Sequence, residues 1–422
     1  SRNRFKSFFE KEIDKWKSDL NSINDVHTAL KETQNKWTFL ESLFLGSDEI
    51  KRELPEDTEK FVQIDKEVRE ILRKGNQVKN ILNFSTSKFG EKSLLDWLKD
   101  LIRRLEECER SLNIFMDRKK TDFPRFYFIS SVDLLDILSN GNNPTKINKH
   151  ISKVILAIDK LELIEEKGDR PSVKGMHTRV GKEYVQFFAE CKMLGKVENY
   201  LSLILNFMNQ TLKNIAKVSL QDFQKLSQLE WIEKTPSQIA LLTDLIVFVD
   251  RVETALANLQ NDPKSIDKLA KTQNDSLTSL IKTVMMNLTE ETMAKVMVLI
   301  KLETHNRDVV YDKIIGENVT SIEAFQWQSQ LKAYWAKEKE DCHLNVCDAE
   351  FWYGYEYLGN GDRLVVTPLT DRIYVTATQA LHLKLGCAPA GPAGTGKTAR
   401  VIVFATGATA DAALAAGADE VG

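Results

Sequence analysis

The sequence predicts a mainly α protein, with elongated helical bundles and one short β insert over about the first 340 of its 422 residues. A smaller α/β unit is expected to begin after them. Nine of the 19 glycines lie in residues 1–340 and ten in the last 82, and prolines are also sparse early. Long stretches without either residue favour long helices, and apolar residues recur there at steps of three and four.

Composition and charge narrow the range of functions. The chain has 58 Lys and Arg against 61 Asp and Glu, a net charge of −3, so it lacks the basic excess that attracts nucleic acid. Its 42% hydrophobic and 28% charged residues are typical of a globular protein rather than a disordered or membrane one. The most apolar stretch, residues 240–249, is too short to span a bilayer. We therefore expect neither nucleic-acid nor membrane partners.

Three stretches have the apolar spacing of amphipathic helices: residues 5–44, 182–215 and 238–259. The first stripe consists of Phe5, Phe9, Ile13, Trp16, Leu20, Ile23, Leu30, Trp37 and Phe44. The second consists of Tyr184, Phe188, Cys191, Leu194, Val197, Leu201, Ile204, Met208 and Leu212. Such stripes predict the core-facing sides of helices in a bundle.

The predicted β insert lies between the first two of these helices. Residues 123–129 are dense in aromatic and β-branched side chains, which favours a strand. Ser130 or Ser131 is then expected to cap a short helix over residues 132–138, and Gly141 suits a position just past its end.

The pattern changes near residue 350. Residues 351–361 contain five aromatic residues and three glycines. Short strands are expected at residues 364–366 and 373–375, followed by a short helix over residues 377–385. Just before this region, the charged run at residues 337–341 is interpreted as a solvated helix end.

One motif carries recognisable chemistry, because residues 391–398 match G-x-x-x-x-G-K-[ST]. The motif consists of Gly391, Pro392, Ala393, Gly394, Thr395, Gly396, Lys397 and Thr398. In such a P-loop, backbone N–H groups surround the phosphates of ATP, Lys397 reaches the β- and γ-phosphates, and the Thr398 hydroxyl ligates Mg²⁺. A strand ending near residues 387–390 should precede the loop, and a helix should follow it.

Hydrolysis needs more than a P-loop: an acidic residue on a neighbouring strand, and usually an arginine. The acids after Thr398 are Asp411, Asp419 and Glu420, and none follows an apolar strand. We therefore assign no catalytic residue and expect no ATP turnover by this chain alone. Cys342, His343 and Cys347 lack a second pair of ligands at zinc spacing, and the five scattered cysteines suggest reduced thiols in a cytosolic protein.

Several stretches together resemble the dynein heavy chains. They are residues 37–44 with 54–56, residues 123–128 with 134–138, residues 325–331, residues 355–359, residues 367–372 and the P-loop, in the expected order. The resemblance implies a helical linker domain over residues 1–353 and the N-terminal part of the first AAA+ module over residues 354–398. The phrase at residues 138–142 resembles the ciliary dyneins more than the cytoplasmic ones.

The resemblance also implies a function. The chain would be a fragment of a microtubule minus-end-directed motor, in which a linker arm converts ATP binding and hydrolysis at the first AAA+ module into a power stroke. The implied cofactors are ATP and Mg²⁺. The implied partners are the remaining AAA+ ring of the same heavy chain, the microtubule through the stalk, and dynein intermediate and light chains, in the axoneme of a cilium or flagellum. The alternative is a non-enzymatic helical scaffold or tether with a vestigial P-loop.

The likeness to dyneins stops after Thr398. Residues 401–405 favour a strand and residues 410–416 a helix of small residues. Residues 400–422 resemble a fragment of ribosomal protein L-one, so residues 399–422 are interpreted as a tail of different origin. This interpretation places the helix expected beneath the phosphates in question.

Overall fold

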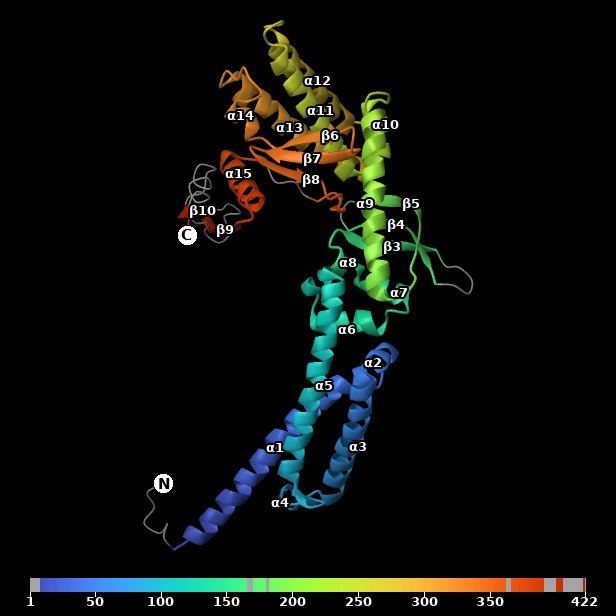
Figure 1. Ribbon diagram of the computed structural model, residues 1–422, viewed down its shortest axis with the longest axis vertical. Coiled ribbons are helices and arrows are strands. Elements are labelled where there is room, and N and C mark those ends of the chain that lie inside the picture. The colour runs from blue at the N-terminus through green and yellow to red at the C-terminus, as the bar shows by residue number, and fades with distance from the viewer. Residues whose placement is uncertain are drawn as a thin grey trace. The chain divides into compact units, whose positions relative to one another are not determined.

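The computed structural model describes residues 8–164, 170–179, 182–361, 366–390, 400–404 and 420–421 (Figure 1). Helices make up most of this described part, and four small sheets of two or three strands accompany them. The predicted mainly α fold is therefore confirmed. The chain divides into two compact units, residues 1–154 with 193–202 and residues 155–192 with 203–422. Within the described ranges, no helix is long and apolar enough to cross a membrane.

The first unit is built on three long helices, α1, α3 and α5, which pack along one another (Figure 1). Its elements are α1 (Glu10–Phe44), α2 (Asp48–Glu53), α3 (Pro55–Val78), α4 (Ile81–Ser85), β1 (Lys88–Phe89), β2 (Lys92–Ser93), α5 (Leu94–Asp122), the 3₁₀ helix η1 (Pro124–Phe128), α6 (Ser131–Ser139), α7 (Pro144–Ile147), the 3₁₀ helix η2 (Asn148–His150), α8 (Ile151–Val154) and the start of α9 (Val197–Asp222). Phe44 of α1 stacks on Phe61 of α3 with ring centres 5.3 Å apart, and both side chains are fully buried.

The apolar stripe predicted on the first helix is confirmed as helical but only partly as core. Trp37 and Phe44, near the end of α1, are buried, whereas Ile13, Trp16 and Leu20, near its start, are exposed. The spacing of apolar residues indicates that a helix has an apolar face, but that face is buried only where a neighbouring element packs against it. Phe5 lies outside the described residues.

The strand predicted at residues 123–129 is wrong, because this segment forms the 3₁₀ helix η1. Pro124 stands at its first position, where the fixed φ of proline favours a helical turn. Phe126 is fully buried, so the aromatic density reflects core packing. The following helix is confirmed as α6, and Ser130 Oγ caps it by accepting a hydrogen bond from Asp133 N–H at 3.2 Å.

The start of the second predicted helix forms a strand instead. An antiparallel sheet in the order β3–β4–β5 consists of β3 (Ile158–Ile164), β4 (Ser172–Thr178) and β5 (Tyr184–Lys192). In β5, Val185 and Phe187 are buried and Gln186 between them is exposed, so burial alternates with the period of a strand. Gly195, with a φ of +83°, separates this strand from α9, where the predicted helix is confirmed.

The second unit continues with a helical bundle and a second antiparallel sheet (Figure 1). These elements are α10 (Gln228–Lys234), α11 (Ser237–Ala257), α12 (Ser265–Val284), α13 (Glu290–Asp308), the π-helix η3 (Val309–Ile315), α14 (Phe325–Gln328), β6 (Lys332–Ala336), β7 (Asp341–Val346) and β8 (Ala349–Trp352). The predicted helix over residues 238–259 is confirmed as α11. Trp327 and Phe248 belong to one buried apolar cluster of this unit, and Trp231 and Ile232 belong to another.

The charged run at residues 337–341, predicted as a helix end, belongs instead to the connection between β6 and β7 and the start of β7. Ala336 pairs with Asp341 across this hairpin, and Glu340 has a φ of +47°, as a tight turn requires. The described residues before 353 therefore contain the two-stranded sheet β1–β2 and two three-stranded sheets, β3–β5 and β6–β8, in place of the single β insert predicted near residue 126.

The bundle of the second unit buries two hydrogen-bonded acids, Glu303 on α13 and Asp244 on α11. Glu303 is 3% exposed and also accepts hydrogen bonds from Gln273 and, at 3.2 Å, from Ser276 Oγ. Burial raises the pKa of Glu303, because its charged form loses hydration. A folded-state pKa raised in this way means that stability is fully present below the unfolded-state pKa and is lost as the pH rises through the raised value.

We predict that Glu303→Gln makes the free energy of unfolding less dependent on pH between about pH 5 and about pH 8. The amide is neutral throughout and can still donate to Asp244 and accept from Gln273. Urea denaturation of the 422-residue chain at both pH values measures the effect. The exposed Glu323→Gln serves as control and should keep the wild-type pH dependence. An unchanged pH dependence in Glu303→Gln would contradict the assignment.

Candidate nucleotide-binding site

The P-loop, residues 391–398, lies outside the described residues, so the candidate site is built from the elements on either side of it. The strand predicted before the loop is confirmed as β9 (Gly386–Ala390). After the loop, β10 (Arg400–Phe404) pairs antiparallel with β9, and β11 (Glu420–Val421) pairs parallel with β10. Ala390 lies opposite Arg400, so the last residue before the loop region and the first described residue after it lie side by side at one end of the β9–β10 pair.

The element directly after the P-loop differs from the expected one. Among the described residues after the motif, a strand begins at Arg400 where a helix was predicted. The strand predicted from residue 401 is confirmed, and the helix predicted over residues 410–416 lies outside the described residues. From Arg400 the described chain is a strand, in place of the helix whose N-terminal dipole was expected to favour the phosphates.

One long helix, α15 (Pro368–His382), precedes β9. The strand predicted at residues 373–375 is wrong, because these residues lie inside α15, and the helix predicted from residue 377 begins earlier. Thr367 and Thr370 cap the helix reciprocally: Thr367 N–H donates to Thr370 Oγ1 at 2.7 Å, and Thr370 N–H donates to Thr367 Oγ1 at 3.3 Å. The sequence Thr-Pro-x-Thr, with Pro368 at the first helical position, is the helix start signal at this point of the chain.

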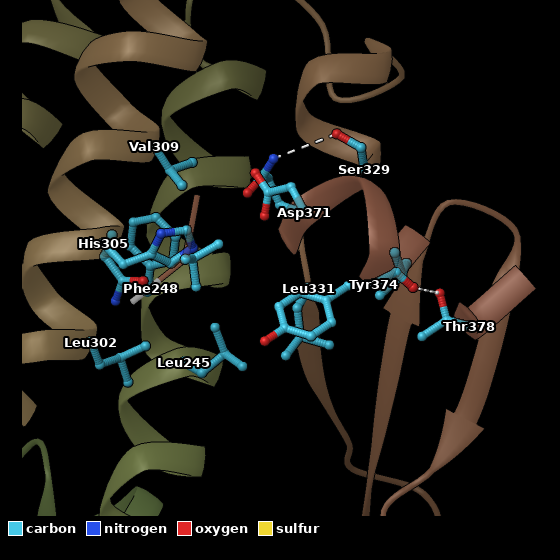
Figure 2. Close-up of a pocket in the computed structure, with 14 residues that line it drawn as sticks. Leu245, Phe248, Leu302, His305, Val309, Ser329, Leu331, Asp371, Tyr374 and Thr378 are labelled. Carbon is cyan, nitrogen blue, oxygen red and sulfur yellow. Dashed lines mark hydrogen bonds between the residues drawn. The ribbon is translucent and has the colours of Figure 1, made fainter. Parts of the chain in front are cut away.

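A cavity of about 420 Å³ lies beside α15 in the second unit (Figure 2). Apolar side chains form most of its wall, among them Leu245, Phe248, Leu302, Val309, Leu331 and Val346. From α15, Asp371, Tyr374 and Thr378 line it. Burial raises the pKa of the Asp371 carboxyl, although His305 and Lys313 act in the opposite direction. His305, Asn306 and Gln330 offer N–H donors in this wall, but its described residues include no lysine or arginine, and Asp371 is an acid. A site for phosphates usually combines N–H donors with a cation, so this cavity does not suit a nucleotide.

A second feature connects this region to the rest of the unit: the segment 353–361, which comes after β8 and which we call the strap. Three of its residues are tyrosines at alternate positions, and each hydroxyl bonds a different element. Tyr353 Oη accepts from Gln238 Nε2 at 2.7 Å, and Tyr355 Oη donates to Asp341 Oδ1 at 2.9 Å. Tyr357 Oη donates to Glu183 Oε2 at 2.6 Å. The partners lie at the start of α11, at the start of β7 and just before β5.

Glu183 is 2% exposed and receives several donors. Its Oε1 accepts from Ser237 N–H at 2.7 Å and from Ser237 Oγ at 3.1 Å, and Lys295 Nζ lies 3.4 Å away. Pro236, the residue before α11, offers no side-chain cap, so the Glu183 carboxylate satisfies the first turn of this helix instead. Burial, followed by the effect of Glu183, raises the pKa of Tyr357, so that its hydroxyl stays protonated and keeps donating.

Gln238 bonds the main chain of the strap as well as Tyr353. Its Nε2 donates to Glu356 O at 2.7 Å, and its Oε1 accepts from Leu358 N–H at 2.7 Å. One residue further, Gly359 has a φ of +66°, and a Cβ at this position would come within 2.4 Å of Thr178 Oγ1. Only glycine fits both the backbone conformation and the space.

Metal ligation and reactive thiols are the two other kinds of site to consider in the described part of the chain. There, no group of three or more His, Cys, Asp or Glu side chains is placed to hold a metal ion. Cys342 is fully buried, and burial raises the pKa of its thiol to about 12, which leaves it unreactive.

Two family descriptions match the chain. "Dynein heavy chain, N-terminal region 2" matches residues 1–219, and "Hydrolytic ATP binding site of dynein motor region" matches residues 353–413. The second match covers the strap, α15, β9 and the whole P-loop, and it runs past Thr398. The likeness of residues 400–422 to a ribosomal protein finds no support, and that interpretation is corrected.

Individual relatives agree with these matches. The chain is 43% identical over 400 residues to the dynein alpha chain of the flagellar outer arm of Chlamydomonas reinhardtii. It is 39% identical over 399 residues to human dynein axonemal heavy chain 17, and 39% identical over 393 residues to the ciliary dynein beta chain of Heliocidaris crassispina. These alignments cover 92% to 94% of this chain but about 9% of each relative. With family matches over more than half of its length, the chain belongs to the dynein heavy chains.

Proposed function

We propose that this chain is the linker arm, with the start of the first AAA+ module, of a microtubule minus-end-directed motor driven by ATP. In this proposal the linker domain is residues 1–353, and the module begins with residues 354–398. The observation that supports it is the order of the two matches on one chain, an N-terminal dynein region followed by a dynein ATP site. The arm converts ATP binding and hydrolysis at the module into a power stroke.

The proposed nucleotide site is the P-loop. Its residues are Gly391, Pro392, Ala393, Gly394, Thr395, Gly396, Lys397 and Thr398. β9 leads directly into the loop, as the strand of a P-loop does, so the residues present fit a nucleotide on that side. Lys397 holds the β- and γ-phosphates and Thr398 holds the Mg²⁺ of Mg-ATP. Bound ATP supplies the γ-phosphate whose presence distinguishes the two states of the motor.

The proposed partners and location follow from the family. The partners are the remaining AAA+ ring of the same heavy chain, the microtubule through the stalk, and the dynein intermediate and light chains. The location is the axoneme of a cilium or flagellum, because the matching relatives carry the names flagellar outer arm, axonemal and ciliary dynein.

The alternative is a non-enzymatic helical scaffold or tether with a vestigial P-loop. The strand at Arg400, where the motif normally leads into a helix, is the observation that favours it. The two proposals differ in one respect that can be measured: a motor must bind Mg-ATP and change shape on doing so, and a scaffold need not.

We predict that the intact heavy chain binds Mg-ATP and that the distance between a label on the arm and a label on the ring changes on binding. A ligand moves such an equilibrium only if it binds one conformation better than the other, so ADP should give a smaller change than ATP. Equilibrium binding and fluorescence energy transfer between the labels measure the two parts. An intact chain that binds no Mg-ATP, or binds it without a distance change, would favour the scaffold.

A further inference from the structure

We propose that the strap is clamped to the bundle and the sheets of the second unit by its three tyrosines and by Gln238, so that it moves with this part of the linker arm as one body. Movement of the ATP module is then passed to the arm instead of being absorbed in the connecting chain. The coupling part of this inference rests on the proposed motor function, whereas the clamp itself does not. Glu183 and Gln238 are positioning residues in this scheme, because they act through the strap.

The clamp holds the strap at separate points on the bundle and the sheets. Tyr357 is fully buried and so is Glu183, so their hydroxyl–carboxylate bond is shielded from water, whereas Tyr355 is 4% exposed and bonds the partly exposed Asp341. Hydrogen bonds to charged acceptors are stronger than neutral ones, and a buried acceptor that loses its donor is costly. Because Glu183 also caps α11 and lies beside Lys295, the anchor of Tyr357 is tied to two helices of the bundle.

Gln238 also holds the strap through hydrogen bonds to its main chain, which do not depend on the side chains of the strap. It donates to the carbonyl of Glu356 and accepts from the N–H of Leu358, two residues further on. A single amide side chain therefore satisfies main-chain groups that a neighbouring β-strand would otherwise bond. This arrangement fixes the position of the strap along its length as well as its distance from α11.

The backbone of the strap is held in uncommon conformations. Tyr355 has a φ of +50°, which is rare for a bulky residue, and Gly359 has a φ of +66° against Thr178. Such conformations persist where the surroundings determine them strongly. The strap therefore has one defined shape, which is what a rigid connection requires.

The first experiment tests the clamp in the 422-residue chain by hydrogen exchange at the Leu358 amide. Tyr357→Phe removes one hydroxyl and keeps the ring, and we expect exchange to become about tenfold faster or more. Tyr334→Phe is the matched control, because Tyr334 Oη donates to the Glu253 carboxylate, also at 2.6 Å, away from the strap. It should leave the Leu358 amide as in wild type. Equal exchange in the two variants would overturn the clamp.

The second experiment tests coupling in the intact heavy chain with the arm and ring labels. Tyr357→Phe and Gln238→Leu should reduce the ATP-dependent distance change while leaving the KM for ATP near its wild-type value, and Tyr334→Phe should change neither. A normal distance change in a variant whose strap exchanges faster would overturn the coupling. A wild-type chain with no ATP-dependent change would overturn the motor proposal and the coupling with it, while the exchange result still decides the clamp.

Discussion

In the intact heavy chain of the proposed motor, Lys397→Ala is expected to weaken Mg-ATP binding about tenfold to a hundredfold and to abolish the proposed ATP-dependent swing of the arm. The reason is that the ammonium group of Lys397 is the charge that a P-loop offers to the β- and γ-phosphates. Losing one charge-assisted contact costs on the order of 1.5–3 kcal/mol, which corresponds to that range of affinity. The swing should suffer more than binding, because contact with the γ-phosphate is what separates ATP from ADP.

Equilibrium binding and the arm–ring distance at saturating ATP give the two readouts separately. Lys337→Ala, in the exposed connection between β6 and β7, also removes one positive charge and should leave both readouts unchanged. Circular dichroism should show that the helices remain folded, because the buried apolar residues that stabilise them lie in elements other than the P-loop. A mutant that still swings normally at saturating ATP would show that Lys397 does not couple binding to movement.

The elements that the sequence predicts well are those whose signals are local. For α6, the cap residue Ser130, the acid in the first turn and Gly141 all lie within a dozen residues. The sequence predicts a helix where the strand Tyr184–Lys192 lies, because apolar residues at positions 184, 188 and 191 also fit helical spacing. Only pairing with β4, which no local signal indicates, selects the period of a strand.

In the candidate site too, the parts with local sequence signals could be predicted and the parts formed by distant residues could not. The P-loop is a contiguous motif, so its residues and the strand before it can be predicted, although the strand after it departs from the pattern. The aromatic density of the strap is visible in the sequence, but its role is not. Tyr357 and Glu183 are 174 positions apart, and Gln238 is 120 positions from Leu358. Partners so distant in sequence are brought together only by the packed bundle.

The remaining large effect is expected in the first unit, where a buried lysine lies between two buried acids. Lys119 of α5 is 4% exposed, and its Nζ lies 2.6 Å from Glu198 Oε1 and 3.8 Å from Glu49 Oε1. Burial raises the pKa of Glu49, and the charge of Lys119 opposes this rise. The positive charge of Lys119 therefore offsets part of the free-energy cost of burying the two carboxylates, a cost that would be high for a buried carboxylate without a cation.

We predict that Lys119→Met lowers the free energy of unfolding by about 3–5 kcal/mol near neutral pH, because it leaves buried carboxylates without their cation. The loss should shrink as the pH falls, since a carboxyl whose folded-state pKa is raised contributes its stability below the unfolded-state pKa and loses it as the pH rises. Urea denaturation of the 422-residue chain measures this loss. Lys120→Met, which breaks an ion pair with the exposed Asp117, is the matched control and should cost under about 1 kcal/mol.

A double variant separates the lost charge from the changed shape. If the unpaired carboxylate causes the instability, adding Glu198→Gln to Lys119→Met should recover part of the loss, because a neutral amide costs less to bury than an unpaired carboxylate. If the cause is instead the changed packing against Phe115, whose ring centre lies 5.4 Å from the Lys119 ammonium, the second substitution should recover nothing. The pH dependence gives an independent answer, since a packing defect is the same at every pH and an unpaired acid is not.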